Sequence, residues 1–326
     1  MASEGESRVS AIRFENISKR FSDAGVAAVE DVTLEIPSGA FVVLLGPSGC
    51  GKTTLLKMVN RLIEPTSGSI ALDGEDIRQL EPTDLRRRIG YVIQQVGLFP
   101  HMTVAQNIAV VPELLKWPRE RIEARVRELL ELVALPAGEY CGRYPAQLSG
   151  GQQQRVGVAR ALAGDPKVVL MDEPFGAIDA ITRTALQDEL LRLQRQLRKT
   201  ILFVTHDVEE ALRLADRIVV MREGRVVQYD SPVALLTRPA DAFVSHLLGA
   251  DDMVRQLGLI RVDAAMSPLT LPPDELAAAP AIPAAADLRQ ALSLLLRTGA
   301  TALKVTSGGA FVGQLTLERI RAAARE

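Results

Sequence analysis

The chain has 326 residues, and its 38 Lys and Arg against 40 Asp and Glu give a formal net charge of -2. This balance, without a basic tail, argues against nucleic acid as a partner, and no apolar run reaches the roughly 18 residues that span a bilayer. The polar, acidic start lacks the features of a signal peptide, so we expect a cytosolic protein of more than one domain. Two distant cysteines, Cys50 and Cys141, form no disulfide framework.

The first elements are predicted strands. Residues 11–21 and 31–36 alternate apolar and polar side chains, which is typical of antiparallel strands with one solvated face. Phe21 lies where the next loop starts. Its ring is a candidate for stacking on a purine, and packing in the core is an equal alternative.

A glycine-rich loop follows a short apolar run. Residues 41–45 predict a buried parallel strand and residues 54–59 have helical spacing, and between them lies Gly46-Pro47-Ser48-Gly49-Cys50-Gly51-Lys52-Thr53-Thr54. The glycines let backbone amides converge on an anion, and the start of the helix adds partial positive charge. The sequence therefore predicts a phosphate-binding loop.

Two side chains of this loop suit a nucleotide triphosphate. Lys52 would reach the β- and γ-phosphates, and the Thr53 hydroxyl would ligate Mg²⁺. The alternative is a glycine-rich turn with a surface lysine. A match to G-x-x-x-x-G-K-[ST] should arise by accident in roughly one chain in a hundred of this length, so we favour the nucleotide site.

The next segment predicts strands at 68–74 and 88–93, then a loop. Gln94 and Gln95 precede Val96-Gly97-Leu98-Phe99-Pro100-His101-Met102. An uncharged apolar loop is costly to leave in water, so it either packs locally or receives a partner. An apolar stripe over residues 122–133 predicts an amphipathic helix of an inserted subdomain.

A second candidate anion site begins the following helix. The run Leu148-Ser149-Gly150-Gly151-Gln152 opens a segment with an apolar face, and Ser149 is a good N-cap. A phosphate loop and a separate anion-binding helix start suggest two sites that meet at one nucleotide, within one chain or between two.

Two later strands end in candidate catalytic side chains. The apolar residues 167–171 end in Asp172 and Glu173, where a P-loop fold places an aspartate for Mg²⁺ and a glutamate facing the attacking water. The alternative is two acids at a helix start. The strand 201–205 ends at His206. A catalytic role and a structural role are both open for this histidine.

Together these residues resemble the ATPase subunits of ATP-binding cassette (ABC) transporters, over about residues 11–250. In the family order of motifs the counterparts are Phe21 in the adenine-stacking loop, 46–53 as the Walker A loop, Gln94 of the Q-loop, 148–152 as the LSGGQ signature, 168–173 as Walker B, Asp179 of the D-loop and His206 of the switch loop. Two departures are Phe21 for the usual tyrosine and Gly176-Ala177-Ile178-Asp179 for Ser-Ala-Leu-Asp.

The resemblance implies a homodimer with ATP and Mg²⁺ between one chain's Walker A loop and the other's signature. Glu173 would be the general base, His206 would contact the γ-phosphate, and Lys52, Thr53, Asp172 and Gln94 would hold phosphate and metal. Ser149, Gly150, Gly151 and Gln152 would complete the site in trans. The implied fold is a mixed α/β core with an antiparallel β subdomain and an inserted helical subdomain.

The loop from Leu98 to Met102 resembles that of importer subunits, where it receives a coupling helix of the permease. The resemblance thus implies a peripheral subunit at the cytoplasmic face of a membrane, working with a permease and indirectly with a substrate-binding protein. The branch that it resembles imports quaternary-ammonium osmoprotectants such as glycine betaine, choline or carnitine. Importers of amino acids or other small solutes, and ABC ATPases that act on DNA or ribosomes, are the alternatives.

The composition changes after about residue 250 to Ala and Pro, which marks a linker within a second domain at 251–326. Residues 287–296 predict an amphipathic helix, and 302–305 and 310–315 predict strands around a Ser-Gly-Gly turn. This small α+β unit resembles one cystathionine-β-synthase (CBS) repeat. Two repeats normally pair to form a module, so pairing between chains and a degenerate remnant are the alternatives. Arg319 stands where the family has a ribose-binding aspartate three residues after Thr316, so we expect no adenine nucleotide there.

Overall fold

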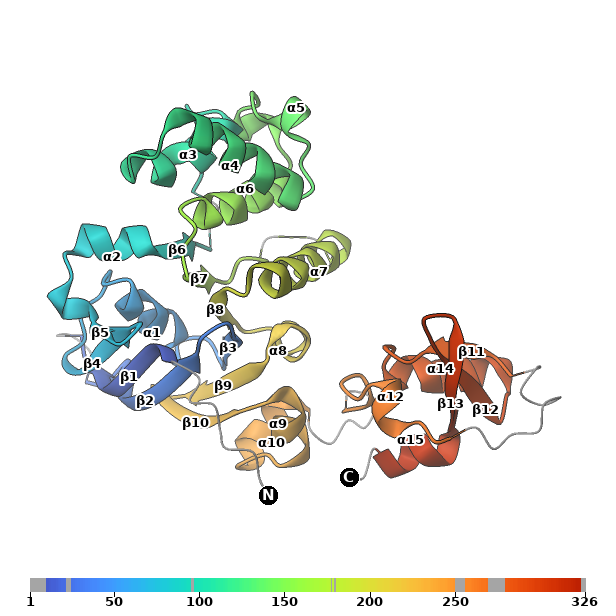
Figure 1. The fold of residues 1–326 in the computed structure, drawn as a ribbon. Coiled ribbons are helices and arrows are strands. Elements are labelled where there is room, and N and C mark those ends of the chain that lie inside the picture. Colours follow the sequence, from blue (N-terminus) through green and yellow to red (C-terminus); the bar gives the residue numbers. More distant parts are fainter. Residues whose placement is uncertain are drawn as a thin grey trace, which may run out of the picture. The chain divides into compact units, whose positions relative to one another are not determined.

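The computed structural model describes residues 10–21, 25–94, 97–176, 178, 180–249, 256–268 and 279–323. The chain divides into two compact units, Met1–Tyr229 and Asp230–Glu326. Figure 1 shows the helices and strands of the chain. This division lies about twenty residues before the boundary at 250/251 that the composition predicts, which stays a prediction. Among the described residues, no helix is long and apolar enough to cross a membrane.

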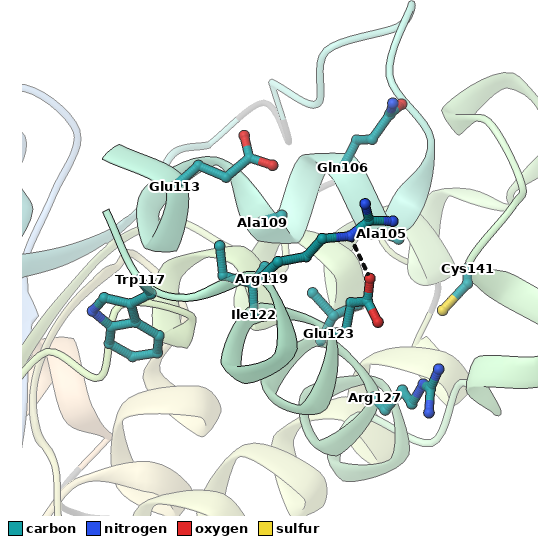
Figure 2. A pocket seen from close by; sticks show the side chains of 11 residues that line it. Ala105, Gln106, Ala109, Glu113, Trp117, Arg119, Ile122, Glu123, Arg127 and Cys141 are labelled. Carbon is teal, nitrogen blue, oxygen red and sulfur yellow. Dashed lines mark hydrogen bonds and ion pairs between the residues drawn. The ribbon is translucent and has the colours of Figure 1, made fainter. Parts of the chain in front are cut away.

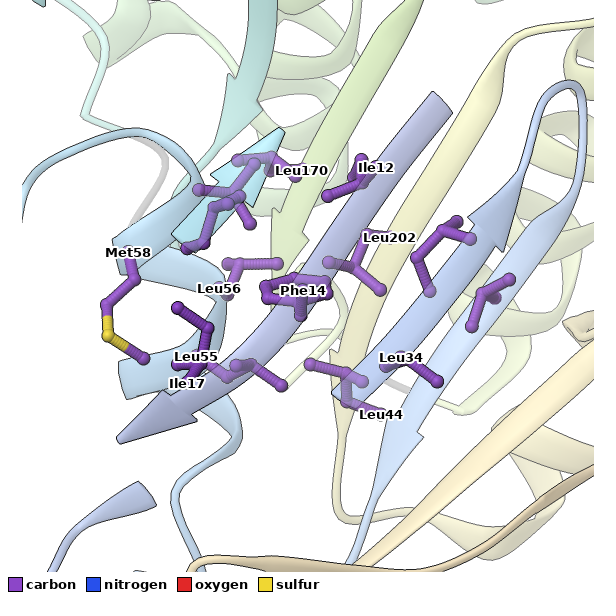
Figure 3. Close-up of a cluster of buried hydrophobic side chains, with 14 of the residues drawn as sticks. Ile12, Phe14, Ile17, Leu34, Leu44, Leu55, Leu56, Met58, Leu170 and Leu202 are labelled. Carbon is purple, nitrogen blue, oxygen red and sulfur yellow. The ribbon is translucent and has the colours of Figure 1, made fainter. Parts of the chain in front are cut away.

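An antiparallel sheet begins the first unit. Its described strands, in the spatial order β2-β1-β4-β5, are β1 (Ser10–Lys19), β2 (Val29–Pro37), β4 (Ser67–Leu72) and β5 (Glu75–Asp76). The alternating side chains of β1 put Ile12, Phe14 and Ile17 in the core, where Phe14 lies near Leu56 and Leu202 (Figure 3). The predicted antiparallel pair is confirmed.

A larger sheet carries the predicted phosphate loop. Its described strands, in the order β10-β9-β3-β8-β7-β6, are β3 (Phe41–Leu45), β6 (Ile89–Val92), β7 (Val168–Asp172), β8 (Thr200–Thr205), β9 (Arg217–Arg222) and β10 (Arg225–Asp230). Strands β3, β7 and β8 are buried throughout and pair in parallel, as their continuous apolar runs predict. The loops after parallel strands emerge at one edge, so the segments after β3, β6, β7 and β8 can meet there.

Helices cover this sheet. The described ones of the core are α1 (Lys52–Val59), the 3-10 turn η1 (Ile77–Gln79), α2 (Pro82–Arg88), α7 (Ala180–Leu197) and α8 (Val208–Leu214). Leu55, Leu56 and Met58 of α1 are fully buried between the two sheets (Figure 3). This burial fixes the start of α1 at the edge where the phosphate loop lies.

A helical subdomain is inserted between β6 and β7. It contains α3 (Val104–Leu114), α4 (Arg119–Leu132), α5 (Ala137–Tyr140), the 3-10 turn η2 (Pro145–Gln147) and α6 (Gly150–Leu162). Val126, Leu129 and Leu130 form the buried face of α4, which confirms the predicted amphipathic helix. Helix α6 packs on α3, α4 and β6, and a Cβ at Gly90 of β6 would lie 2.5 Å from the carbonyl oxygen of Ala161.

The second unit contains the described elements α9 (Pro232–Thr237), α10 (Ala242–Leu248), α12 (Val262–Ala265), β11 (Ala281–Pro283), α14 (Leu288–Thr298), β12 (Ala302–Ser307), β13 (Ala310–Thr316) and α15 (Leu317–Ala323). In its sheet, β12 pairs in parallel with β11 and antiparallel with β13. The predicted helix at 287–296 and the two predicted strands are confirmed. Leu288, Leu295 and Val305 belong to a core of this unit.

Candidate active site

The phosphate loop is a backbone conformation that requires glycine. Gly46, Gly49 and Gly51 have φ values of +155°, +81° and +105°. A Cβ at Gly46 would lie 2.2 Å from the carbonyl oxygen of Met221, and one at Gly51 would lie 2.3 Å from that of Ala28. The loop therefore presses against neighbouring backbone, while Pro47, Ser48 and Gly49 stay exposed at its tip.

Lys52 lies inside the loop. Its side chain is 5% exposed, and Nζ donates hydrogen bonds to the carbonyl oxygens of Gly46 at 2.7 Å and Pro47 at 2.9 Å. Nζ also lies 3.8 Å from Sγ of Cys50, which is buried and free. The ammonium and the start of α1 place positive charge at one point, which is the electrostatic requirement of a phosphate site.

Thr53 and Asp172 form an oxygen pair beside the loop. Oγ1 of Thr53 donates to Oδ1 of Asp172 at 2.8 Å, and the neighbouring Thr54 is half-buried. Burial raises the pKa of the Asp172 carboxyl, and the Thr53 hydrogen bond opposes that shift. A hydroxyl and a desolvated carboxylate are donors that suit Mg²⁺, because a cation would relieve the cost of the buried negative charge. The residues present thus fit the predicted metal.

Glu173 lies at the centre of a three-residue cluster. Nε2 of Gln94 donates to its Oε2 at 3.2 Å, and Nδ1 of His206 lies 3.3 Å from its Oε1. The backbone of Glu173 is left-handed, with φ of 44°, and its N–H donates to the Val204 carbonyl at 3.0 Å. The unusual φ turns the carboxylate away from the line of β7 and towards the ends of β6 and β8.

The signature residues lie elsewhere in the chain. Ser149 is the N-cap of α6, and it exchanges two hydrogen bonds with Gln152, at 2.9 and 3.3 Å. Gly150 and Gly151 form the first turn. Among the residues that the structure describes, no hydrogen bond or ion pair joins 149–152 to the loop 46–53. The helix start is thus well formed, and within the described part of the chain its polar contacts are local.

Two further residues of the predicted nucleotide site are Phe21 and Asp179. The Phe21 ring is 44% exposed and lies under Lys19, whose Nζ is 5.1 Å from the ring centroid. The alternative that this ring packs in the core is therefore wrong. Its stacking on a purine stays a prediction. Asp179 lies outside the described residues.

Asn107, which the sequence did not single out, holds the apolar loop. Its side chain is fully buried in α3. Its Oδ1 accepts from the Phe99 N–H at 2.8 Å, and Nδ2 donates to the Phe99 and Met102 carbonyls, both at 3.1 Å. An asparagine among the apolar residues at 104–112 is the signal that could have identified it.

The loop lines a groove between the sheet and the helical subdomain. The groove has a volume of about 330 Å³ and is lined by Tyr91, Phe99, Val111 and Arg160, among others. Phe99 is 40% exposed, and the Arg160 guanidinium lies 5.8 Å from its ring centroid and donates to the Gly97 carbonyl at 2.8 Å. The loop is thus fixed locally but leaves an apolar side chain at the surface.

A second cavity lies within the helical subdomain, between α3 and α4 (Figure 2). Its volume is about 670 Å³, and its lining includes Trp117, Cys141 and the ion pair of Arg119 with Glu123 at 2.9 Å. Neither the phosphate loop nor the Glu173 cluster lines it. Size alone therefore does not identify the site.

The sequence is similar to proteins of one family. The family described as ABC transporter matches residues 29–176. The chain is 53% identical over 268 residues to the choline transport ATP-binding protein OpuBA of Bacillus subtilis, covering 81% of this chain and 70% of that protein. It is 51% identical over 297 residues to the glycine betaine uptake system ATP-binding protein YehX of Escherichia coli, covering 91% and 94%.

A solved structure has a similar fold and belongs to the same kind of protein, an ATP-binding cassette. The dimeric, post-hydrolysis structure of an ATP-binding cassette with ADP and Pi has a TM-score of 0.61 and 34% identity, covering 68% of this chain and 98% of that one. Several relatives from Bacillus and Listeria are longer, and the match spans only 61 to 70% of their length. From the phosphate loop, the Glu173 cluster and these similarities, we conclude that the chain belongs to the ABC transporter family, as an ATP-binding subunit.

Proposed function

We propose that this chain is the ATP-hydrolysing motor of an importer for quaternary-ammonium osmoprotectants. The observation that carries the catalytic part is the position of Glu173, held between Gln94 and His206 beside the Thr53–Asp172 pair. The loop 46–54 supplies the anion-binding amides and Lys52 the cation. These groups occupy the edge of one parallel sheet, where a triphosphate can reach all of them.

The chemistry follows from this arrangement. Lys52 and the start of α1 bind the phosphates and neutralise charge that develops on them. Glu173 accepts a proton from the water that attacks the γ-phosphate, while Gln94 and His206 set the direction of its carboxylate. Thr53, Asp172 and Gln94 would hold Mg²⁺, which supplies positive charge to the phosphate oxygens when bound.

A homodimer would complete the site. Ser149, Gly150, Gly151 and Gln152 form an anion-binding helix start that this chain does not bring to its own loop. A second copy, placed head to tail, would supply it, with Asp179 close to the shared nucleotide. The dimeric form of the similar cassette supports this arrangement.

The loop at 98–102 would receive a transmembrane permease. Asn107 fixes its backbone and the groove beside it is partly apolar, so a helix with apolar side chains could dock there. Because Gln94 lies just before this loop and contacts Glu173, docking and hydrolysis would be coupled. We place the subunit at the cytoplasmic face of the membrane, with an extracytoplasmic binding protein as an indirect partner.

The substrate assignment is supported by similarity. Two relatives are a choline transporter subunit and a glycine betaine uptake subunit. An alignment over 297 residues cannot fit within residues 1–250, so the likeness to the second includes the C-terminal unit. An importer of amino acids or another small solute, and a non-transport ABC ATPase, are the alternatives.

The second unit would be a single CBS-like repeat. The order β11, α14, β12, β13, α15 supports this proposal. Arg319 donates through Nε to the Ala265 carbonyl at 3.1 Å, and its N–H donates to Oγ1 of Thr316 at 3.3 Å. The residue in the ribose position therefore has an internal partner and adds no acceptor for a ribose hydroxyl.

Uptake measurements test the function. Cells that lack this subunit and any other such system should lose uptake of labelled betaine and choline. The wild-type chain should restore it, and Glu173→Gln should not. Unchanged uptake in the cells without the subunit would overturn the substrate, and loss of labelled amino-acid uptake instead would favour the alternative.

A further inference from the structure

We propose that Arg183 and Glu210 are positioning residues for His206, and that they tie it to the segment at Ile178. This inference rests on the proposed function, in which His206 contacts the nucleotide. Both residues lie away from the phosphate loop, on α7 and α8, so they would act through His206 and not on substrate.

Glu210 holds the residue before His206. It is 5% exposed, and its Oε2 accepts from Oγ1 of Thr205 at 2.7 Å while its Oε1 accepts from Nε2 of Gln187 at 3.3 Å. Thr205 Oγ1 in turn accepts from the Asp207 N–H at 3.0 Å. A buried carboxylate is expensive unless it is hydrogen-bonded, so this arrangement strongly constrains the end of β8.

Arg183 holds the residue after His206. Its Nη1 lies 3.4 Å from Oδ2 of Asp207, its Nε lies 3.9 Å from Oε1 of Glu210, and its Nη2 donates to the Ile178 carbonyl at 3.0 Å. One planar guanidinium on α7 therefore joins two other segments, the start of α8 at Asp207 and Glu210 and the segment at Ile178. A lysine ammonium is a point charge on a flexible stem and does not reproduce this fork.

His206 depends on these neighbours for its direction. Its side chain is 59% exposed and meets Glu173 at 3.3 Å, so little packing limits its rotation. The network fixes the backbone on both sides of it, at Thr205 and Asp207. Shifts on the order of 1 Å at a reacting group can cost up to 100-fold in rate, so this constraint bears on catalysis.

The same Arg183 guanidinium also contacts the segment before helix α7, at Ile178. Ile178 is followed directly by Asp179, the residue that would lie near the shared nucleotide in the dimer. If that segment moves by more than about 1 Å, the bond from Arg183 to Ile178 is lost, because hydrogen bonds weaken steeply with distance. Movement at Ile178 would then reach His206 through Asp207.

Arg183→Met tests the proposal in the full-length chain. We expect kcat for MgATP to fall about tenfold with KM changed less than twofold, and Arg183→Lys to recover only part of the loss. The matched control is Arg213→Met, which breaks another α7–α8 ion pair, to Asp188 at 2.6 Å, that does not reach Thr205 or Asp207. An equal loss of kcat in the control would overturn the proposal.

A second readout does not depend on turnover. The chain has three histidines, so a selective label gives three imidazole signals, assigned by His101→Gln and His246→Gln. In Arg183→Met and Glu210→Gln the His206 signal should shift, while those of His101 and His246 stay in place. An unmoved His206 signal in both folded variants would refute the positioning role. A wild-type chain without ATPase activity would refute the proposed function but leave this test intact.

Discussion

Nε2 of Gln94 donates a hydrogen bond to Oε2 of Glu173 at 3.2 Å, across 79 positions of sequence. Gln94 lies two residues after strand β6, just before the apolar loop, and Glu173 directly follows the neighbouring strand β7. The residue that we propose as general base is thus bonded to the residue that adjoins the docking loop. In the proposed function this bond would link permease docking to the chemistry, and the first two predictions concern Glu173 and the loop at 98–102.

Glu173→Gln should lower ATP turnover by at least about 100-fold, because the amide cannot accept the proton of the attacking water. Binding of ATP should change little, since Lys52 and the loop amides remain. The trapped ATP should hold two chains together, which light scattering after size-exclusion chromatography detects. Glu128→Gln, a surface carboxylate paired with Arg125, is the control. A monomer with normal turnover would contradict the two-chain site.

Phe99→Asp should spare basal ATPase activity and abolish the stimulation by permease. The ring is 40% exposed and Asn107 holds the loop through its backbone, so the substitution should cost less than about 1.5 kcal/mol of stability. ATPase assays with and without permease in vesicles measure the effect. Phe311→Asp, at an exposed phenylalanine of the second unit, should change neither activity. If Phe99→Asp unfolds the subunit, the side chain belongs to the core.

Gly46→Ala should destabilise the chain far more than Gly49→Ala. Both residues have positive φ, but a Cβ at Gly49 meets nothing within 4 Å, so the cost there is backbone strain of about 1–2 kcal/mol. At Gly46 the Cβ would lie 2.2 Å from a carbonyl oxygen, so strand β9 or the loop must also move. Urea unfolding of the two variants measures the difference. Equal costs would show that the loop is looser than its geometry indicates.

Glu210→Gln should change how stability depends on pH. Burial raises the pKa of the Glu210 carboxyl, against the hydrogen bonds from Thr205 and Gln187 and the charge of Arg183, while Asp207 raises it further. The native state therefore keeps this proton to higher pH than the unfolded chain does. Stability contributed by the group falls as pH rises from about 4.3 through the raised pKa.

The variant lacks this titration, so its stability relative to wild type should increase with pH across that window and then stay constant. Urea unfolding at a series of pH values, with Glu128→Gln as an exposed control, measures the difference. A difference that is independent of pH would show that Glu210 has an ordinary pKa in the native state.

The second unit should not bind AMP. Arg319 occupies the proposed ribose position and is already bonded to Ala265, and a guanidinium has no acceptor for the ribose hydroxyls. Calorimetric titration of the full chain carrying Lys52→Ala, which silences the phosphate loop, isolates the contribution of this unit. Heat that indicates micromolar AMP binding would contradict the prediction. Arg319→Asp on the same background tests whether the ribose acceptor alone is missing.

Local features of the chain were predictable from sequence because they depend on contiguous residues. The loop 46–54 needs glycine at defined positions, and the short apolar run before it predicts a buried strand. The stripe of α4 and the N-cap at Ser149 follow from helical spacing and capping preference. These patterns determine the backbone φ angles, the spacing of apolar residues and the capping of helices over a few residues. They can therefore be recognised in the sequence without knowledge of the fold.

Tertiary structure decided which of these parts meet. Gln94, Glu173 and His206 converge because strands β6, β7 and β8 are neighbours in one parallel sheet, an order that periodicity does not encode. Arg183 and Glu210 look like ordinary polar residues of amphipathic helices, and Asn107 is a single asparagine among apolar neighbours. They were identified only once the folded chain had buried them against backbone carbonyls, N–H groups and charges far away in sequence, because the cost of an unpaired buried polar group exists only in the folded state.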